Sequence, residues 1–269
     1  MGKTTDYKLC HILITGASSG LGAALALHYA EKGTLLFLAG RNEERLGNVA
    51  GQCQEKGAQV ITGLFDVCEA EEAESWIKQC HAYAPLDLVI ANAGISAGSD
   101  LAERANDMRI FRVNLDGVLN VFYPAAELMS AQGRGQIALM SSLAGYRGWP
   151  GAPAYCASKA AVKTFGESMR TPMARRGVKL NVICPGFIKT PLTDRNNFSM
   201  PFLMSAPRAA EIIARGLKRN KSRIAFPFPA VFVAWFFSVL PDSLAQCFLK
   251  HSPDKPLVAG QEDSSNCEN

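Results

Sequence analysis

Two residues whose side chains can move a proton lie four positions apart in the middle of the chain. Tyr155 and Lys159 fall in the segment AYCASKAAVKTF, and Ser142 lies thirteen residues before the tyrosine. Small residues with apolar ones at helical spacing predict a helix here, and an i,i+4 spacing places the phenol and the ammonium on one face. An ammonium beside a phenol stabilises the phenolate. It is expected to lower the phenol pKa from about 10 towards the range where tyrosine exchanges a proton with a substrate oxygen.

The loop between Ser142 and Tyr155 is apolar and rich in glycine and proline. Such a loop is suited to fold the serine hydroxyl back over the helix face that carries the tyrosine. Tyr-x-x-x-Lys by itself is also an ordinary surface pair on a helix. The rest of the chain must therefore indicate whether a cofactor and a substrate would lie beside these groups.

The composition is that of one α/β domain with a large core. The chain has 269 residues, 48% of them hydrophobic, and a formal net charge of +4. Its cationic residues are scattered apart from a short run at 218–223, which is too local to indicate nucleic acid. The eight cysteines show no CxxC pair and no metal spacing with the four histidines, so we expect buried thiols and no metal. The first ten residues lack the apolar core of a signal peptide, which predicts a cytoplasmic protein.

A glycine-rich turn follows the first apolar run of the chain. Residues 10–15 (CHILIT) predict a strand, GASSGLG follows, and a helical pattern continues to Gly33. In this context glycines permit a tight turn and close approach of the backbone to a pyrophosphate, whose charge the helix N-terminus favours. The alternative is a plain glycine-rich connection. The cofactor-binding candidates in this turn are Gly16, Ser18, Ser19, Gly20, Leu21 and Gly22.

The end of the second predicted strand indicates which dinucleotide binds. Residues 34–39 (TLLFLA) form this strand, Arg41 follows it, and no acidic residue lies between Gly33 and Asn42. An acidic residue here would bind the ribose 2′-hydroxyl of NAD, whereas an arginine accommodates the 2′-phosphate of NADP. Arg41 therefore predicts NADP(H), and the serines of the glycine turn could add hydroxyl donors. The alternative for Arg41 is a solvated arginine at the start of a helix.

The remaining apolar runs and helical patterns predict a doubly wound α/β fold of the Rossmann type. Each predicted strand ends in a polar or glycine turn, and helical patterns alternate with the strands. This alternation is typical of a mostly parallel sheet with helices on both faces, whose ligand lies at the carboxyl ends of the strands. Further strands are expected at 58–67, 86–94, 135–142, 178–184 and 223–226, and further helices at 43–56, 69–82, 106–129, 154–176 and 207–217.

Polar and glycine residues follow two of these strands. Asp66, beside Val67, is suited either to bind the adenine amino group or to cap the next helix. Asn92-Ala93-Gly94 ends the next strand, where glycine lets the backbone come close to a cofactor ribose. Asn114 lies in the apolar helical segment VNL, so we expect it to be buried and hydrogen-bonded, either as a helix kink or in a functional role.

These motifs together resemble those of the short-chain dehydrogenases/reductases. Each is weak alone, but their order and spacing are highly specific, and the resemblance covers about Lys8 to Phe226. The chain departs from the family pattern at Ala91, where an asparagine is common, and at Pro172, which we expect to kink or shorten the central helix. The matching motifs are Thr15-Gly16-x-x-x-Gly20-x-Gly22, Asn92-Ala93-Gly94, Asn114, Ser142, Tyr155-x-x-x-Lys159, and Asn181 through Pro185-Gly186 to Thr190.

The resemblance implies a role for each matching residue. Tyr155 is similar to the family's general acid in carbonyl reduction and base in alcohol oxidation, and Lys159 to the residue that lowers its pKa and holds the nicotinamide ribose. Ser142 would hydrogen-bond the substrate oxygen, and Asn114 would hold a water that connects the lysine to solvent. The residues that would position the nicotinamide carboxamide are Pro185, Gly186, Ile188 and Thr190.

We therefore expect an NADPH-dependent reduction of a ketone or aldehyde to an alcohol, or the reverse. Residues 143–153 and 187–206 are apolar on balance, which favours an apolar substrate, and 187–200 is interpreted as a lid or a surface excursion. One alternative is a non-catalytic NADP(H)-binding sensor or scaffold on the same fold, and another is a Rossmann methyltransferase. The resemblance favours a homodimer or homotetramer.

An apolar extension follows the predicted catalytic domain. Residues 224–241 carry no charge, and their early prolines leave too short a run to span a bilayer. Three placements are open: a packed helix that covers the substrate site or a subunit interface, insertion into a membrane surface, or a re-entrant placement. The aromatic residues at 235–237 would anchor any of them. The expected organisation is a catalytic domain at 1–226, a helical extension at 227–251 and a disordered tail at 252–269.

Overall fold

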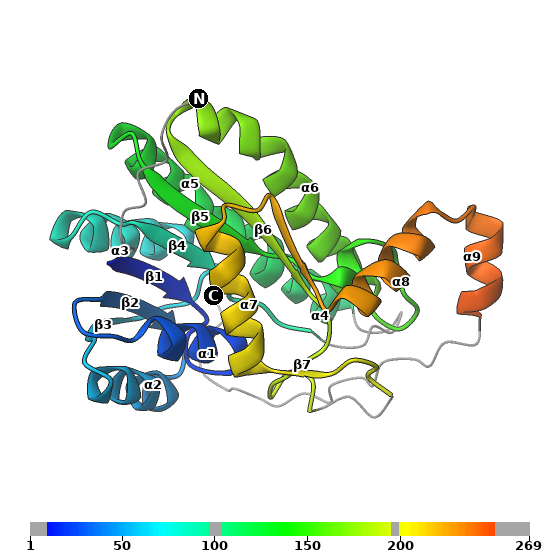
Figure 1. Cartoon of the computed structure of the whole chain (residues 1–269), viewed down its shortest axis with the longest axis horizontal. Coiled ribbons are helices and arrows are strands. Elements are labelled where there is room, and N and C mark those ends of the chain that lie inside the picture. The colour runs from blue at the N-terminus through cyan, green and yellow to red at the C-terminus, as the bar shows by residue number, and fades with distance from the viewer. Residues whose placement is uncertain (1–9, 97–103, 195–198, 251–269) are drawn as a thin grey trace.

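Seven of the apolar runs form strands that pair side by side in one parallel sheet (Figure 1). The computed structural model of the chain describes residues 10–96, 104–194 and 199–250. Within them the strand order is β3-β2-β1-β4-β5-β6-β9, and every pairing is parallel. The order reverses at β1, so the carboxyl ends of β1 and β4 flank the crevice where open α/β sheets bind ligands.

The strands agree closely with the sequence-based expectation. The third and fourth strands are the exceptions, because both are shorter than expected. The ladder of β3 with β2 ends at the pair Gly40–Leu64, before Asp66, and β4 ends at Ala91, before Asn92. A short second sheet joins two strands after β6. The strand bounds are β1 (His11–Thr15), β2 (Leu35–Gly40), β3 (Gln59–Leu64), β4 (Leu88–Ala91), β5 (Gly135–Met140), β6 (Val178–Pro185), β7 (Ile188–Lys189), β8 (Met204–Ser205) and β9 (Arg223–Phe226).

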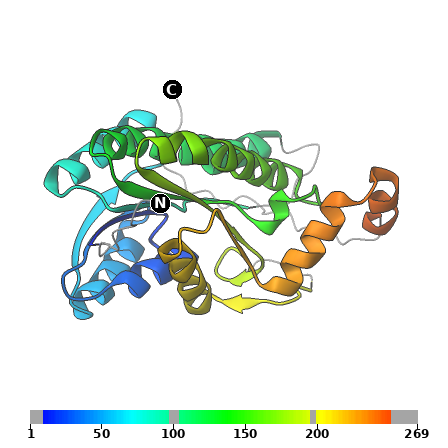
Figure 2. The same ribbon diagram turned by 45° about the horizontal axis from the view of Figure 1, so that its top comes forward.

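Helices cover both faces of the large sheet (Figure 2). One apolar core lies between the sheet and α1, α2 and α7, and the other between the sheet and α3, α5 and α6. The helix bounds are α1 (Gly20–Tyr29), α2 (Glu43–Glu55), α3 (Ala70–Tyr83), α4 (Arg104–Phe111), α5 (Gly117–Ala131), α6 (Pro153–Arg175), α7 (Ala206–Lys218), α8 (Phe228–Val239) and α9 (Asp242–Leu249).

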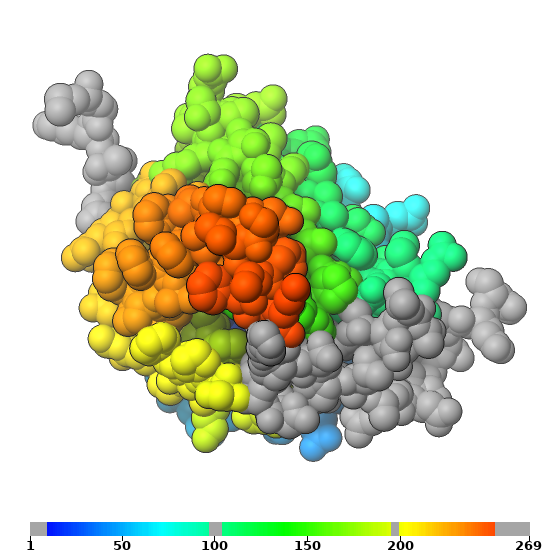
Figure 3. All heavy atoms as spheres, turned by 90° about the vertical axis from the view of Figure 1, so that its right-hand side faces the viewer, coloured from blue at the N-terminus to red at the C-terminus, as the bar shows by residue number. Residues whose placement is uncertain are grey.

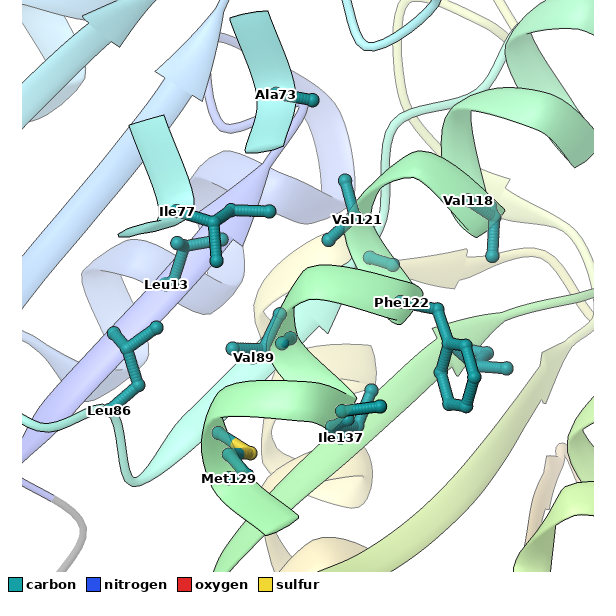
Figure 4. Close-up of a cluster of buried hydrophobic side chains, with 14 of the residues drawn as sticks. Leu13, Ala73, Ile77, Leu86, Val89, Val118, Val121, Phe122, Met129 and Ile137 are labelled. Carbon is teal, nitrogen blue, oxygen red and sulfur yellow. The ribbon is translucent and has the colours of Figure 1, made fainter. Parts of the chain in front are cut away.

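The second core contains the largest group of buried side chains (Figure 4). Leu13 and Val89 point from the sheet towards Ile77 of α3 and Phe122 of α5, and all four side chains are fully buried. Burying apolar surface at about 25 cal/mol per Å² is the main force that holds such layers together. This packing fixes the strand ends, and therefore the site residues that follow them.

The two longest expected helices cover the spans predicted for them, with two local differences. The helix expected at 106–129 is three pieces, because a π-helical turn, η1 (Arg112–Asp116), lies between α4 and α5. The central helix α6 is not shortened by Pro172 and continues to Arg175. The carbonyl that Pro172 leaves without a helical partner belongs to Ser168, which is exposed to water, so the proline costs little there.

The C-terminal extension forms two helices, α8 and α9, instead of one. None of the described helices combines the length and the apolar content needed to cross a bilayer. The tail expected to be disordered lies outside the described residues. The expectation that the cysteines are buried was only partly right, because Cys247 on α9 is exposed.

Candidate active site

The predicted site residues follow consecutive strands at the carboxyl edge of the sheet. The glycine turn follows β1, Arg41 follows β2, and Asn92 follows β4. Ser142 follows β5, and the segment from Pro185 to Thr190 begins at the last residue of β6. Parallel pairing brings these strand ends together, so residues far apart in sequence form one site.

The glycine turn has no room for side chains at its key positions. Gly16 and Gly20 have φ values of 65° and 56°, a left-handed conformation that favours glycine. A Cβ on Gly22 would lie 2.2 Å from the Gly16 carbonyl oxygen, so the start of α1 packs directly on the turn. The turn is a cradle of backbone atoms at a helix N-terminus, which fits the pyrophosphate of a dinucleotide.

Asn92 ties the glycine turn to the end of β4. Its Nδ2 donates to the carbonyl oxygens of Thr15 at 2.9 Å and Gly16 at 3.3 Å. The Thr15 hydroxyl oxygen accepts hydrogen bonds from the backbone N–H groups of Asn92 and Ala93. Thr15 was part of the quoted motif without an assigned role. A buried polar residue that ends an apolar strand was the sequence signal for it.

Tyr155 and Ser142 meet across the loop that joins β5 to α6. The Ser142 hydroxyl is hydrogen-bonded to the Tyr155 phenol, and its oxygen also accepts from the N–H of Ala144 at 3.1 Å. A short 3₁₀ turn, η2 (Leu143–Gly145), brings the serine back over α6. A Cβ on Gly145 would lie 2.7 Å from the backbone carbon of Lys159, so this turn packs against the helix backbone. The fold-back predicted from the loop composition is thereby confirmed.

Lys159 lies beneath Tyr155 and is almost completely buried, with 3% of its surface exposed. Its Nζ donates to the Met140 carbonyl oxygen at 3.0 Å and lies 5.8 Å from the centre of the Tyr155 ring. Burial lowers the pKa of this ammonium to about 8. The lysine therefore exchanges its proton far more easily than a surface lysine does.

The prediction of a lowered Tyr155 pKa was wrong for this structure. Burial disfavours the phenolate and raises the phenol pKa, and the hydrogen bond with Ser142 offsets only part of this effect. The causes of this shift do not include Lys159, whose ammonium donates to the carbonyl of Met140. Sequence spacing places both residues on one helix face but does not determine which acceptor the lysine selects.

Asn114 sits in the π-helical turn and is fully buried. Its Oδ1 accepts from the Ile95 N–H at 2.8 Å, while its Nδ2 donates to the Ile95 carbonyl at 2.9 Å and to the Ser158 hydroxyl at 3.2 Å. The Ser158 hydroxyl in turn donates to the Tyr155 carbonyl at 2.8 Å. This chain links the β4 loop to α6. Ser158 was missed from the sequence, although it is a small polar residue between the two expected catalytic ones.

At Gly94 the backbone comes close to the polar ends of Asn114 and Lys159. A Cβ at this position would lie 3.2 Å from Asn114 Oδ1 and 3.3 Å from Lys159 Nζ, so a side chain would crowd both atoms. Both atoms can form hydrogen bonds, which is the chemistry that a ribose hydroxyl needs. The residues present therefore fit the nicotinamide ribose of a dinucleotide.

Arg41 and Asp66 lie together at the ends of β2 and β3. The Arg41 Nη1 donates to Asp66 Oδ2 at 3.1 Å, and both side chains are partly exposed. A Cβ on Gly40 would lie 3.2 Å from the Ser18 Oγ, so this serine is beside the same strand end. The two expected adenosine contacts are thus neighbours, and Asp66 Oδ1 also accepts from the Cys68 N–H at 3.0 Å.

The segment after β6 closes the site from the other side. A Cβ on Gly20 would lie 3.2 Å from the Thr190 side chain, so this threonine contacts the glycine turn. The Thr193 hydroxyl holds the segment, because it donates to the Ile188 carbonyl at 2.7 Å and accepts from the Thr190 N–H at 2.9 Å. Part of the expected lid, residues 195–198, lies outside the described residues. No cluster of metal-binding side chains occurs among the described residues.

Comparisons with known proteins agree with this geometry. The sequence matches the short chain dehydrogenase family over residues 10–200. It is 39% identical to an uncharacterized oxidoreductase of Myxococcus xanthus over 236 residues, and this alignment covers 86% of this chain and 93% of the relative. It is 36% identical over 213 residues to a 3beta-hydroxysteroid dehydrogenase of Mediterraneibacter gnavus, which covers 76% of this chain and 74% of that protein.

Solved structures show the same architecture. A short-chain type dehydrogenase/reductase from Mycobacterium marinum superposes with a TM-score of 0.73 and 25% identity, covering 81% of this chain and 93% of that one. The actinorhodin polyketide ketoreductase with NADPH superposes with a TM-score of 0.72 and 26% identity, covering 80% and 94%.

The chain therefore belongs to the short-chain dehydrogenase family. As a member it is an oxidoreductase that uses NAD(P)(H) and acts between an alcohol and a carbonyl compound. The methyltransferase alternative is wrong.

Proposed function

We propose that the protein reduces an apolar ketone or aldehyde to an alcohol with NADPH, or catalyses the reverse reaction. The observation that carries this proposal is the hydrogen bond between Ser142 and Tyr155 directly above the buried Lys159. A non-catalytic sensor would have no need for this arrangement, in which a buried ammonium carries a cost in stability.

The side chains of the site have separate roles in the proposed reaction. The Tyr155 hydroxyl donates a proton to the substrate oxygen, and the Ser142 hydroxyl donates a hydrogen bond to the same oxygen and stabilises the charge that develops there. Lys159 orients the cofactor ribose and returns the proton to the tyrosine. Asn114 and Ser158 position the helix that carries both residues, and Asn114 would hold a water that connects Lys159 to solvent. NADPH, when bound, supplies the hydride.

The cofactor contacts follow the strand ends. The turn that carries Gly16 to Gly22 would hold the pyrophosphate, and Arg41 with Ser18 and Ser19 would bind the 2′-phosphate. Asp66 and Val67 would contact the adenine, and Asn92 to Gly94 the ribose. The segment from Pro185 to Thr190 would hold the carboxamide. The position of Arg41 directly after β2 supports NADPH over NADH.

The substrate is apolar because the loop above the site is apolar. Leu143 is buried beside Ser142, and Trp149 lies in the same loop. The names of two relatives, a hydroxysteroid dehydrogenase and a polyketide ketoreductase, agree with large carbonyl substrates. We further expect a cytoplasmic enzyme that assembles as a homodimer or homotetramer, which sedimentation of the purified protein would test.

The proposal is tested by NADPH consumption across ketosteroids, quinones, long-chain ketones and aldehydes. We expect turnover of one class, and a loss of at least about 1,000-fold in Tyr155→Phe, which removes the proton donor. Tyr146→Phe is the matched control, because this hydroxyl contacts Arg223 and not Ser142. NADPH binding by Tyr155→Phe shows that the variant is folded. Turnover that survives Tyr155→Phe would contradict the assigned chemistry, and NADPH binding without turnover of any class would favour the sensor.

A further inference from the structure

The two C-terminal helices present their large apolar side chains to solvent and their small ones to the protein. On α8, Ala230, Val231 and Ala234 pack against Leu143 and Val182 of the catalytic domain. Eight large apolar side chains of α8 and α9 are exposed, with exposed fractions between 42% and 81%. They are Phe228, Phe232, Val233, Trp235, Phe236, Val239, Leu244 and Phe248.

This aromatic face, defined by those eight residues, lies at one end of the molecule (Figure 3). In Figure 1, α8 and α9 extend away from the sheet, so no other described helix covers them. A helix that is apolar on every side is ordinarily buried in a core or a membrane. Contiguous exposed apolar patches of this kind mark an interaction surface.

The charges within this segment are already neutralised. From Ile224 to Leu249 the only charged residue is Asp242, and its carboxylate accepts a hydrogen bond from Arg147 at 2.5 Å. The same guanidinium donates to the carbonyl oxygens of Phe237 at 3.2 Å and Leu240 at 3.1 Å, which the end of α8 would otherwise leave unpaired. The backbone carbonyls at this end of α8 are therefore paired, and the exposed Asp242–Arg147 ion pair favours the hydrated headgroup level over the acyl chains.

The face also lacks the groups that would orient a protein partner. Protein interfaces carry a rim of polar and charged residues that set the register between the chains. Two exposed charges lie next to the face: Asp242 at the start of α9, which is paired with Arg147, and Lys250 at its end, which suits an anionic headgroup. Tryptophan and phenylalanine on a short helix are the residues that enter the boundary between headgroups and acyl chains.

The aromatic face is connected to the site by direct packing. The Gly186 N–H donates to the Phe226 carbonyl at 2.8 Å, immediately before α8 begins, and a Cβ on Gly186 would lie 3.2 Å from Pro227. Leu143, the neighbour of Ser142, belongs to the same apolar cluster as Ala234. A surface that binds the aromatic face therefore lies close to the segments that carry Ser142 and Gly186.

From these observations we infer that α8 and α9 dock on the surface of a lipid bilayer, with the aromatic side chains inserted at the headgroup boundary. Docking does not depend on the reaction, and only the delivery of an apolar substrate from the bilayer rests on the proposed function. Because the contact is apolar, it is made to neutral phosphatidylcholine as well as to anionic lipid.

Vesicle sedimentation of the full chain tests the proposal. The double variant Phe232→Ser with Phe236→Ser removes two stacked rings, whose centres are 6.5 Å apart, and retains Trp235 as a fluorescent probe. We expect wild type to sediment with phosphatidylcholine vesicles, and the double variant to partition at least about 30-fold more weakly. The matched control is Leu64→Ser with Tyr83→Ser, two large apolar residues on β3 and α3 that are at least as exposed as Phe236, and it should sediment like wild type.

Each other outcome would overturn the proposal. Binding only to vesicles that contain phosphatidylglycerol, and lost at about 1 M salt, would indicate a charge contact instead. A wild-type dimer that becomes a monomer in the double variant, with no vesicle binding, would assign the face to a second copy of the chain. Retained NADPH binding shows that the double variant is folded, and Tyr155→Phe, although inactive, should sediment like wild type.

Discussion

The guanidinium of Arg41 lies 3.1 Å from the carboxylate of Asp66, where the second and third strands of the sheet end. Burial raises the pKa of Asp66, but hydrogen bonds from Cys68 and Arg41 outweigh it and hold the pKa below its usual range. The carboxylate is therefore ionised at neutral pH and occupies part of the hydrogen-bonding capacity of Arg41. In the proposed function the 2′-phosphate of NADPH shares this arginine with Asp66, and we therefore expect the pair to set the preference for NADPH over NADH.

Arg41→Asp is expected to reverse the cofactor preference. The change removes a charge-assisted hydrogen bond to the phosphate and adds a repulsive charge, so the dissociation constant of NADPH should rise at least about 30-fold. The affinity for NADH should stay equal or improve, because an acidic residue can bind its ribose hydroxyl. Fluorescence titration measures both constants. Arg45→Asp makes the same charge change one helical turn further along α2, and an equal effect there would contradict the role of Arg41.

Asp66→Asn should have the opposite effect. The amide oxygen can still accept from the Cys68 N–H, which Asp66 Oδ1 binds at 3.0 Å, so the local turn is kept. Arg41 then has no anionic partner, and NADPH should bind about three- to tenfold more tightly at low salt, while NADH changes little. If both cofactors gained equally, the effect would belong to the adenine and not to the phosphate.

Much of the fold and most of the site could be predicted from the sequence because both depend on local patterns. Apolar runs ending in glycine or polar turns locate the strands, and parallel pairing then forces Gly16, Asn92 and Ser142 to one edge. The fold-back of Ser142 onto Tyr155 followed from the glycines and prolines of a single loop.

What could not be predicted depends on contacts between distant segments. The π-helical turn around Asn114 exists because its amide binds Ile95 and Ser158, 19 and 44 residues away. The pKa of Tyr155 is raised because the phenol is buried. Lys159 donates to the Met140 carbonyl because β5 ends beside its ammonium. The break between α8 and α9 is different, because it falls at Pro241, which disfavours helical geometry at Leu240 and is visible in the sequence. Only the binding of the Phe237 carbonyl by Arg147, 90 residues earlier in the chain, depends on a distant contact.

Gly145→Ala should weaken both stability and activity. The added methyl group would lie 2.7 Å from the backbone carbon of Lys159 and 2.8 Å from the Ala160 nitrogen, and backbone atoms cannot rotate away. We expect a loss of about 2 kcal/mol or more in the free energy of unfolding, and a displaced Ser142 that lowers kcat. Gly148→Ala is the control in the same loop, because no atom lies within 4 Å of its added carbon. Equal stability of both variants in urea unfolding would disprove the tight packing of the turn on α6.

Lys159→Met should abolish activity and stabilise the protein at neutral pH. Burial lowers the pKa of Lys159 to about 8 in the folded state, from 10.5 in the unfolded chain. The unfolded state therefore binds more protons between these values, and wild-type stability rises with pH across this window. Below pH 8 the buried ammonium lowers the free energy of unfolding by about 3 kcal/mol, and methionine has no such cost. The variant also loses the hydrogen bond to the Met140 carbonyl, which lowers its stability by about 1 kcal/mol. We therefore expect its free energy of unfolding at pH 7 to be about 2 kcal/mol higher than that of wild type.

The pH dependence of this gain separates a buried charge from a simple packing effect. Urea unfolding of both proteins from pH 7 to pH 10.5 should show the difference shrinking above pH 8 and reversing by pH 10.5, where the unfolded lysine also loses its proton. Lys163→Met is the control, because it removes a lysine one turn later in α6 that is less buried than Lys159. Its ammonium lies 4.9 Å from the centre of the Tyr146 ring. A gain of equal size in that control, or a gain at position 159 that is constant with pH, would show that the buried ammonium of Lys159 is not what destabilises the folded state.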